Sequence, residues 1–126
     1  MQRNTTHAEL LHISEAPRLR VSGTAPADGH GPHAVSFAGT MCTMTVPGAM
    51  EAITRWLART EPAHLGVDLA DVEFIDGRGV SLLVALRCQA RALGIQWSIV
   101  DPGCRARDVL DVCELLESMG IESLPH

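Results

Sequence analysis

The stretch VDLADVEFIDGRGVSLLV, residues 67–84, decides the fold of this 126-residue chain. Residues 65–69 are a short apolar run that residues 72–75 continue, which is typical of a buried strand. Asp76 to Gly79 forms a tight turn. After it, apolar or small residues at positions i, i+3, i+4, i+7, i+11 and i+14 predict a helix over residues 79–93 that ends at Gly94: Gly79, Leu82, Leu83, Leu86, Ala90 and Leu93.

Strands and helices are also expected to alternate on both sides of this strand–turn–helix unit. Strands are expected at residues 19–21, 34–38 and 95–100, and helices at residues 46–60 and from about residue 105. Thr45 is the expected N-cap of the first helix, Pro47 suits its first turn, and Pro62 follows its end. Strands that alternate with helices of this length predict parallel β-α-β units, hence an α/β fold.

The N-terminal part of the chain is less regular. Residues 23–33 (GTAPADGHGPH) are rich in glycine and proline and predict a flexible loop between two strands. Residues 1–16 form a polar lead-in that is either partly disordered or an edge strand. We therefore expect this lead-in to be followed by a single domain over residues 17–126, with no internal repeat.

Composition excludes several classes of function. The net charge of −5 argues against nucleic-acid binding, which needs a concentrated basic surface. No apolar run approaches a membrane span, and the N-terminus lacks the apolar stretch of a secretory signal, so we expect a cytoplasmic protein. The four cysteines are widely spaced and the six histidines match no ligand pattern, so we expect free thiols and neither a metal nor another cofactor.

The residues do not predict catalysis. The serines at 36, 81 and 98 lack a G-x-S-x-G turn, and the carboxylates between residues 68 and 76 are of the kind that solvate strand ends or cap helices. The chain contains no lysine, so no phosphate-binding loop of the G-x-x-x-x-G-K-[ST] type is present. We therefore expect a protein that is not an enzyme.

The turn at residues 76–79 and the helix after it are the most informative place. Asp76 either caps the helix, or the free N–H groups there bind an anion. Gly77 and Gly79 permit the tight geometry. The core stripe is expected to leave Val80, Val84, Arg87 and Arg91 on the opposite side of the helix. Those four residues form either an interaction surface or an ordinary surface with scattered valines.

The quoted stretch resembles the signature of the STAS (anti-sigma-factor antagonist) family, in which a V-x-F-[ILM]-D strand leads into D-S-[ST]-G and an apolar helix. Residues 34–41 (AVSFAGTM) are similar to the family's strand that ends in G-E-L-D. Residues 94–102 (GIQWSIVDP) are similar to its G-x-x-[LIV]-x-[LIV]-V-x-P segment, and residues 107–112 to its closing helix. The resemblance covers roughly residues 34–119. No single motif is specific to the family, but the order and spacing of the motifs together are.

The resemblance implies a two-layer α/β fold with a mostly parallel mixed sheet of four to five strands and about four helices. It implies a regulatory protein-binding module whose partner is an anti-sigma factor or a related serine kinase, contacted through seven residues: Asp76, Gly77, Arg78, Gly79, Val80, Val84 and Arg87. An accessory subunit of a lipid-transport ABC system, or a part of a signalling scaffold, is the alternative. In the family, phosphorylation of the serine after the motif aspartate breaks the complex, because it adds charge to the middle of an interface.

The chain departs from the family pattern at the switch itself. Gly77 occupies the position of the phosphorylated serine, and Arg78 that of the usual Ser or Thr. Cys42 replaces the acidic residue of G-E-L-D, and Glu114 the glycine after the closing helix. Either the protein is permanently competent to bind, or its partner and its control are of another kind.

We predict that the usual site carries no phosphate, because Gly77 has no hydroxyl. Incubation with a cognate kinase and ATP should leave the intact mass unchanged. Ser81 is the nearest hydroxyl but lies more than a helical turn further along. Stoichiometric phosphate on Ser81 would show that the switch has moved rather than vanished.

Overall fold

The computed structural model describes residues 6–26 and 32–101, which form five strands and two helices. Along the chain the elements are β1 (Thr6–Glu15), β2 (Arg18–Pro26), β3 (His33–Met41), α1 (Val46–Thr60), β4 (His64–Ile75), α2 (Gly77–Ala92) and β5 (Gln96–Asp101). The helix expected from about residue 105 lies outside the described residues. So do Cys104, Cys113 and Glu114.

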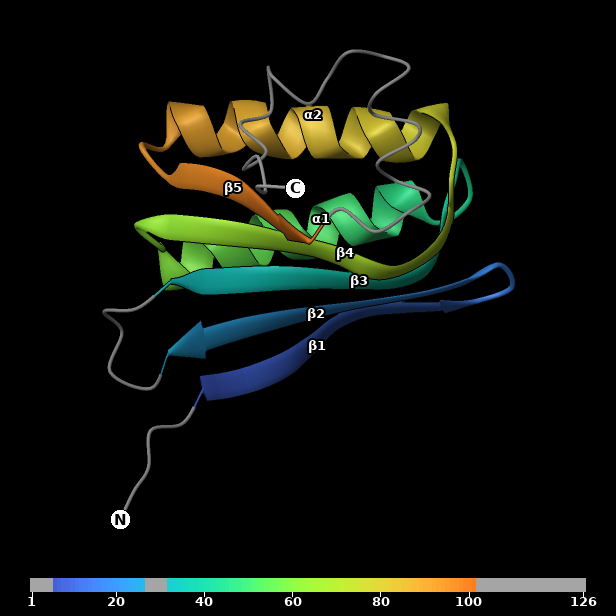
Figure 1. The fold of residues 1–126 in the computed structure, drawn as a ribbon, viewed down its shortest axis with the longest axis horizontal. Helices are drawn as coiled ribbons and strands as arrows, with labels where there is room; N and C mark the ends of the chain where they lie inside the picture. The colour runs from blue at the N-terminus through green and yellow to red at the C-terminus, as the bar shows by residue number, and fades with distance from the viewer. Residues whose placement is uncertain (1–5, 27–31, 102–126) are drawn as a thin grey trace, which may run out of the picture.

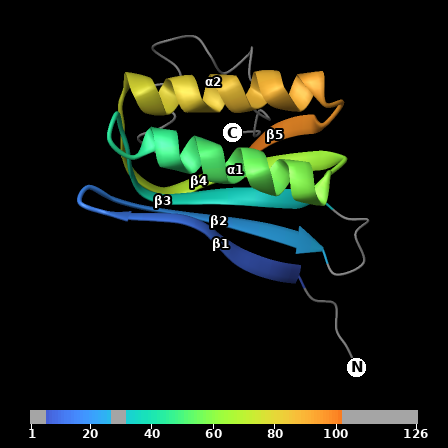
Figure 2. The same cartoon turned by 180° about the vertical axis from the view of Figure 1, so that it is seen from behind.

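The five strands form one mixed sheet in the order β1-β2-β3-β4-β5 (Figure 1). β1, β2 and β3 pair antiparallel, whereas β3, β4 and β5 pair parallel through the crossover helices α1 and α2. The two helices contact each other and cover one face of the sheet, as Figure 2 shows from the helix side. The expected two-layer α/β architecture is therefore confirmed, although half of its strand pairings are antiparallel.

Alternation of side chains gives the sheet a buried face and an open face. In β3, Val35, Phe37 and Met41 are buried beneath the helices, while the alternate residues Ala34, Ser36, Ala38 and Thr40 are only half-buried. These smaller residues belong to the open face, which no element of the described residues covers. On it lie Ser22 and Thr24 of β2, Ala34, Ser36, Ala38 and Thr40 of β3, and Ser98 of β5.

The N-terminal third is more regular than the composition predicts. Residues 1–16 include β1, which is an edge strand and so matches one of the two expected alternatives. β2 runs on to Pro26 and β3 begins at His33, so the prediction of a loop over the whole of residues 23–33 is wrong. Gly23 is paired within β2, and glycine fits there because Trp56 of α1 lies over it: a Cβ at Gly23 would be 2.7 Å from Trp56 Cε2.

Both predicted crossover helices are present, and α2 begins two residues earlier and ends one residue earlier than predicted. α1 has the predicted bounds, and it ends where Glu61 adopts a left-handed conformation and donates its N–H to the Leu57 carbonyl oxygen. Thr45 is at the N-cap position but does not cap the helix. Its buried hydroxyl accepts from the Cys42 N–H at 2.9 Å and donates to the Thr40 carbonyl at 2.9 Å, so it fixes the β3–α1 loop instead.

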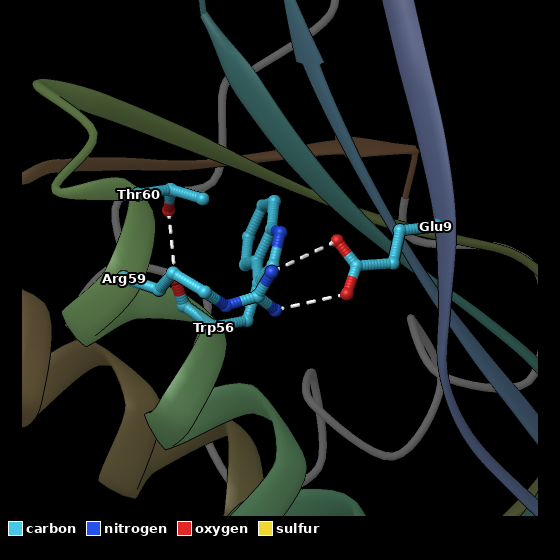
Figure 3. A network of polar contacts seen from close by, with 4 residues as sticks. All are labelled: Glu9, Trp56, Arg59 and Thr60. Atoms are coloured by element: carbon cyan, nitrogen blue, oxygen red, sulfur yellow. Dashed lines mark hydrogen bonds and ion pairs between the residues drawn. The ribbon is translucent and has the colours of Figure 1, made fainter.

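An ion pair on the helix side connects β1 to α1 (Figure 3). Arg59 donates through Nη1 and Nη2 to the two carboxylate oxygens of Glu9, at 3.3 and 2.9 Å. The hydrogen bonds to Glu9, together with the attraction of its charge, raise the pKa of Arg59. Trp56, one turn earlier in α1, is buried, and its carbonyl accepts from the Thr60 hydroxyl at 2.8 Å. The outer strand is thus held to the helix layer.

Neither helix in the described ranges is long and apolar enough to cross a membrane.

Trp56 is the largest fully buried side chain, and its removal should show how much the core depends on it. We expect Trp56→Ala to lower the free energy of unfolding by about 3–5 kcal/mol, because the cavity beneath β2 has no side chain at Gly23 to fill it. Urea unfolding followed by circular dichroism measures this change.

The matched control is Arg55→Ala, one residue earlier in α1. Arg55 pairs with Glu51 at 3.6 Å, but both side chains are 71% exposed, so the change should stay within about 0.5 kcal/mol. Equal losses from the two variants would contradict the packing described for Trp56.

Candidate functional site

Asp76 joins the end of β4 to the start of α2 and binds groups on both sides. Its N–H donates to the Met41 carbonyl of β3 at 3.1 Å, which ties the ends of the two parallel strands together. Its carboxylate Oδ1 accepts from the N–H groups of Arg78 and Gly79 at 2.9 and 3.1 Å. The capping interpretation of Asp76 is therefore confirmed. The carboxylate occupies two of the donors that an anion would need.

Two glycines of the turn meet different surroundings. A Cβ at Gly79 would lie 2.5 Å from Ile75 Cγ1 and 2.8 Å from the Met41 carbonyl oxygen, so only glycine lets α2 approach the strand ends this closely. At Gly77 nothing lies within 4 Å of the same position, and the residue is exposed. The helix is anchored through Gly79, whereas Gly77 faces open space.

The helix surface differs from its prediction at both ends. Val80 is only 6% exposed and belongs to the core, and Val84 is half-buried and packed against it, so the expectation of two exposed valines is wrong. The buried stripe is therefore wider than predicted, and α2 packs against α1 as well as against β4 and β5. Thr54 and Gln89 even form a hydrogen bond between the helices at 3.4 Å. Leu93, expected in the core stripe, follows the last helical residue and is 58% exposed.

The predicted partner residues do not all come together. Asp76 is the N-cap of α2, and Gly77, Arg78 and Gly79 form its first turn, two residues earlier than the predicted helix start; Gly77 and Arg78 are exposed. Arg87 is half-buried and lies nine residues beyond Arg78 on α2, roughly 14 Å along its axis. The turn and the far half of the helix are therefore separate parts of the surface.

Two exposed apolar residues that the sequence analysis did not single out lie at the same end of the sheet. Phe74 is 48% exposed at the end of β4, and Met44 is 72% exposed in the loop after β3. The register shifts between Gly39 and Thr40, so that Thr40 pairs with Phe74, which places Phe74 on the open face. We call Met44, Phe74, Gly77 and Arg78 the turn surface.

The sequence gives only a weak signal that Phe74 and Met44 are exposed. Phe74 stands in an apolar run that is typical of a buried strand, and only the irregular pairing around Glu73 turns it outward. Met44 is an apolar residue in a loop, between a strand and Pro47, which is a hint of exposure but not of a role.

A groove of about 540 Å³ lies on the open face beside the end of β4. Arg18 and Arg20 of β2 line one side of it, and Asp71 and Glu73 of β4 line the other. Two cations are thus matched by two anions, so the groove has no charge preference for a phosphate or another anionic ligand.

The STAS domain family model matches residues 25–124 of the chain. The chain belongs to the STAS domain family. The matched segment contains the Asp76 turn and both crossover helices. A search of curated proteins finds no significant match.

Solved structures similar to the chain share its fold at low identity. An anti-sigma factor antagonist from Mycobacterium paratuberculosis has a TM-score of 0.64 and 20% identity, over 95% of this chain and 87% of that one. The anti-sigma factor antagonist SpoIIAA in its unphosphorylated form has a TM-score of 0.62 and 13% identity, over 93% and 89% of the two chains. SLC26A9 has a TM-score of 0.59 and 13% identity, and this STAS chain matches only 21% of its length.

The two glycines of the turn supply a matched test. We expect Gly79→Ala to destabilise the fold by about 1–3 kcal/mol, because its methyl group would meet the Met41 carbonyl and Ile75. Gly77→Ala should change stability by no more than about 0.5 kcal/mol, since its methyl group enters open space. Thermal and urea unfolding of both variants measure the difference, and a reversed order would contradict the close contact described for Gly79.

Proposed function

We propose that this STAS domain is a non-enzymatic, cytoplasmic regulatory module that binds an anti-sigma factor or a related serine kinase through the turn surface. The observation that carries the proposal is the junction between β4 and α2, which is held by hydrogen bonds and has exposed residues beside it. Asp76 and Gly79 fix the turn, while Arg78, Phe74 and Met44 are exposed beside it.

These residue types suit an interface core. Arginine and aromatic side chains are enriched among the residues that contribute most to binding, and methionine adapts to the shape of a partner. An anchored turn also loses little conformational freedom on binding, which favours affinity. Arg78 is the one cation among the four residues of the turn surface, which favours a partner with a carboxylate opposite it.

The absence of a hydroxyl at Gly77 supports binding without phosphorylation control at the usual site. The position is exposed and has room for a side chain, so packing does not require glycine there. A chain with a serine at that position would fold equally well by this criterion. We infer that the partner complex is regulated by the amount of either protein rather than by a phosphate on this turn.

A permanent contact of this kind also fits the alternative role as an accessory subunit of a lipid-transport ABC system or of a signalling scaffold. The two roles share the turn surface and differ in the partner. Capture from a lysate of the source organism distinguishes them, since recovery of an anti-sigma factor supports the first role and recovery of a permease or an ATPase supports the second.

The binding test uses substitutions that leave the core intact. Arg78→Asp reverses the central charge, and Gly77→Asp places a negative charge where the family carries its phosphate. We expect each to weaken binding by about 2 kcal/mol or more, which is roughly a 30-fold rise in Kd. Calorimetric titration with the captured partner measures the loss.

Gly77→Ala is the matched control for Gly77→Asp, because it adds a side chain to the same open position without charge. Val100→Asp is the control for position, since Val100 is 59% exposed on β5 rather than at the turn. Val84 is unsuitable as a probe, because a carboxylate there would disturb the core. Undiminished binding by Arg78→Asp and Gly77→Asp, or an equal loss in Val100→Asp, would refute the assignment of the turn surface.

A further inference from the structure

Within the described residues, β1 is an outer strand of the sheet with one unpaired edge. It is ten residues long, lies at the outside of the sheet and pairs only with β2 among the described residues. Along such a strand, alternate backbone N–H and C=O groups point away from the sheet and are ready to pair with another strand. An edge of this length needs either a protecting feature or a partner.

The edge is held in place from the helix side. Glu9 forms the ion pair with Arg59 of α1, and Leu11 packs against the core. His12 lies over Gly48 of α1, where a Cβ would be 2.5 Å from its ring. His12 Nε2 is also 2.9 Å from the Ser14 hydroxyl. β1 is therefore a fixed template for pairing and not a loose end.

The opposite side of β1 carries apolar side chains into solvent. Leu10 is 48% exposed and Ile13 is 46% exposed. They stand opposite Ser22 and Arg20 of β2, which belong to the open face, so both extend the open face to its outer edge. A strand edge with two exposed aliphatic residues is the kind of surface that associates.

An irregularity in β1 restricts how it can pair with itself. The register with β2 shifts between Leu10 and His12, so Leu11 is an extra residue. As a result Glu9, Leu11, His12 and Ser14 all lie on the helix side, while Leu10 and Ile13 lie on the open side. Directly opposite residues in an antiparallel pair must share a face.

Only one central register of two antiparallel β1 strands satisfies this condition. If Leu10 lies opposite Ile13 of a second copy, Leu11 lies opposite His12 and Glu9 opposite Ser14, so every pair shares a face. A shift of one residue in either direction places a helix-side residue opposite an open-side residue. The bulge at Leu11 hinders pairing of β1 with a regular strand, whose side chains alternate strictly between the two faces. A second copy of β1 carries the same bulge, so its side chains match in this register.

We propose that the chain forms a twofold dimer in which β1 pairs antiparallel with β1 of a second copy, with Leu10 opposite Ile13. The twofold axis passes between Leu11 and His12, and both copies contribute the same residues, as a closed twofold interface requires. Leu10 and Ile13 of the two copies form one apolar cluster on the open face of a sheet that continues from the five described strands of one copy into those of the other.

The charges of β1 agree with this register. Glu9 lies opposite Ser14 and diagonal to His12 of the second copy, which suits a carboxylate beside an imidazole. Glu15 lies opposite Ala8, so no two acidic residues face each other directly. The proposal does not rest on the proposed function, because the turn surface at the end of β4 takes no part in the pairing.

The test is sedimentation velocity of the full chain over a range of concentrations. The wild-type protein should reach twice the mass of the 13.5 kDa chain, whereas Leu10→Glu and Ile13→Lys should each remain monomeric. Each substitution changes two pairs by symmetry, so we expect the dimer dissociation constant to rise by about tenfold or more. Circular dichroism and thermal melting check that the variants are folded.

An equimolar mixture of the two variants tests the register itself. In the mixed dimer the introduced glutamate of one copy would face the introduced lysine of the other, while the remaining pair is still Ile13 opposite Leu10, so association should return. Val100→Lys, at the other edge of the sheet, should dimerise like the wild-type protein. A monomeric wild-type chain, or a mixture that stays monomeric although both variants are folded, would overturn the proposal.

Hydrogen exchange of the wild-type chain keeps the proposal testable if a variant fails to fold. Amides in residues 8–15 should exchange more slowly at high protein concentration than at low concentration, because pairing protects the outer edge. Protection that appears elsewhere with concentration and leaves residues 8–15 unchanged would assign the dimer to another surface and would also overturn the proposal.

Discussion

The contact of Gly79 with the Met41 carbonyl is the constraint on which the arrangement at this end of the molecule depends. A side chain at position 79 would push the start of α2 away from the end of β3, where the Asp76 N–H donates to the Met41 carbonyl. Because Asp76 donates its N–H to Met41 and accepts from two helix N–H groups, it sets the positions of the strand ends and the helix start together. The exposed residues beside Asp76 are therefore attached to a backbone that is held in place on both sides.

Local patterns predict the parallel half of the fold well. The bounds of α1 follow from Pro47 in its first turn and Pro62 after its end, and the Asp76 cap follows from a short polar residue before an apolar helix. These features depend on neighbouring residues alone. The STAS resemblance added the connection between them, and the family match confirms it.

Long-range packing explains what the sequence did not predict. Gly23 is a loop signal in isolation, but it is paired within β2, where the absence of a side chain leaves space for Trp56. Val80 lies outside the predicted stripe, yet it is 6% exposed and belongs to the core, whose extent depends on how the elements pack together. Phe74 is turned outward by a register shift between β3 and β4 that no local pattern records. The residues nearest the candidate site were therefore the hardest to assign.

The most direct test of a docking role for the turn is a hydrogen-exchange map of the chain with and without its captured partner. We predict slower exchange in residues 41–45 and 74–81 of the complex, because these segments form the turn surface and the backbone that supports it. Unchanged exchange in those segments, with protection confined to another face of the sheet, would contradict the assignment.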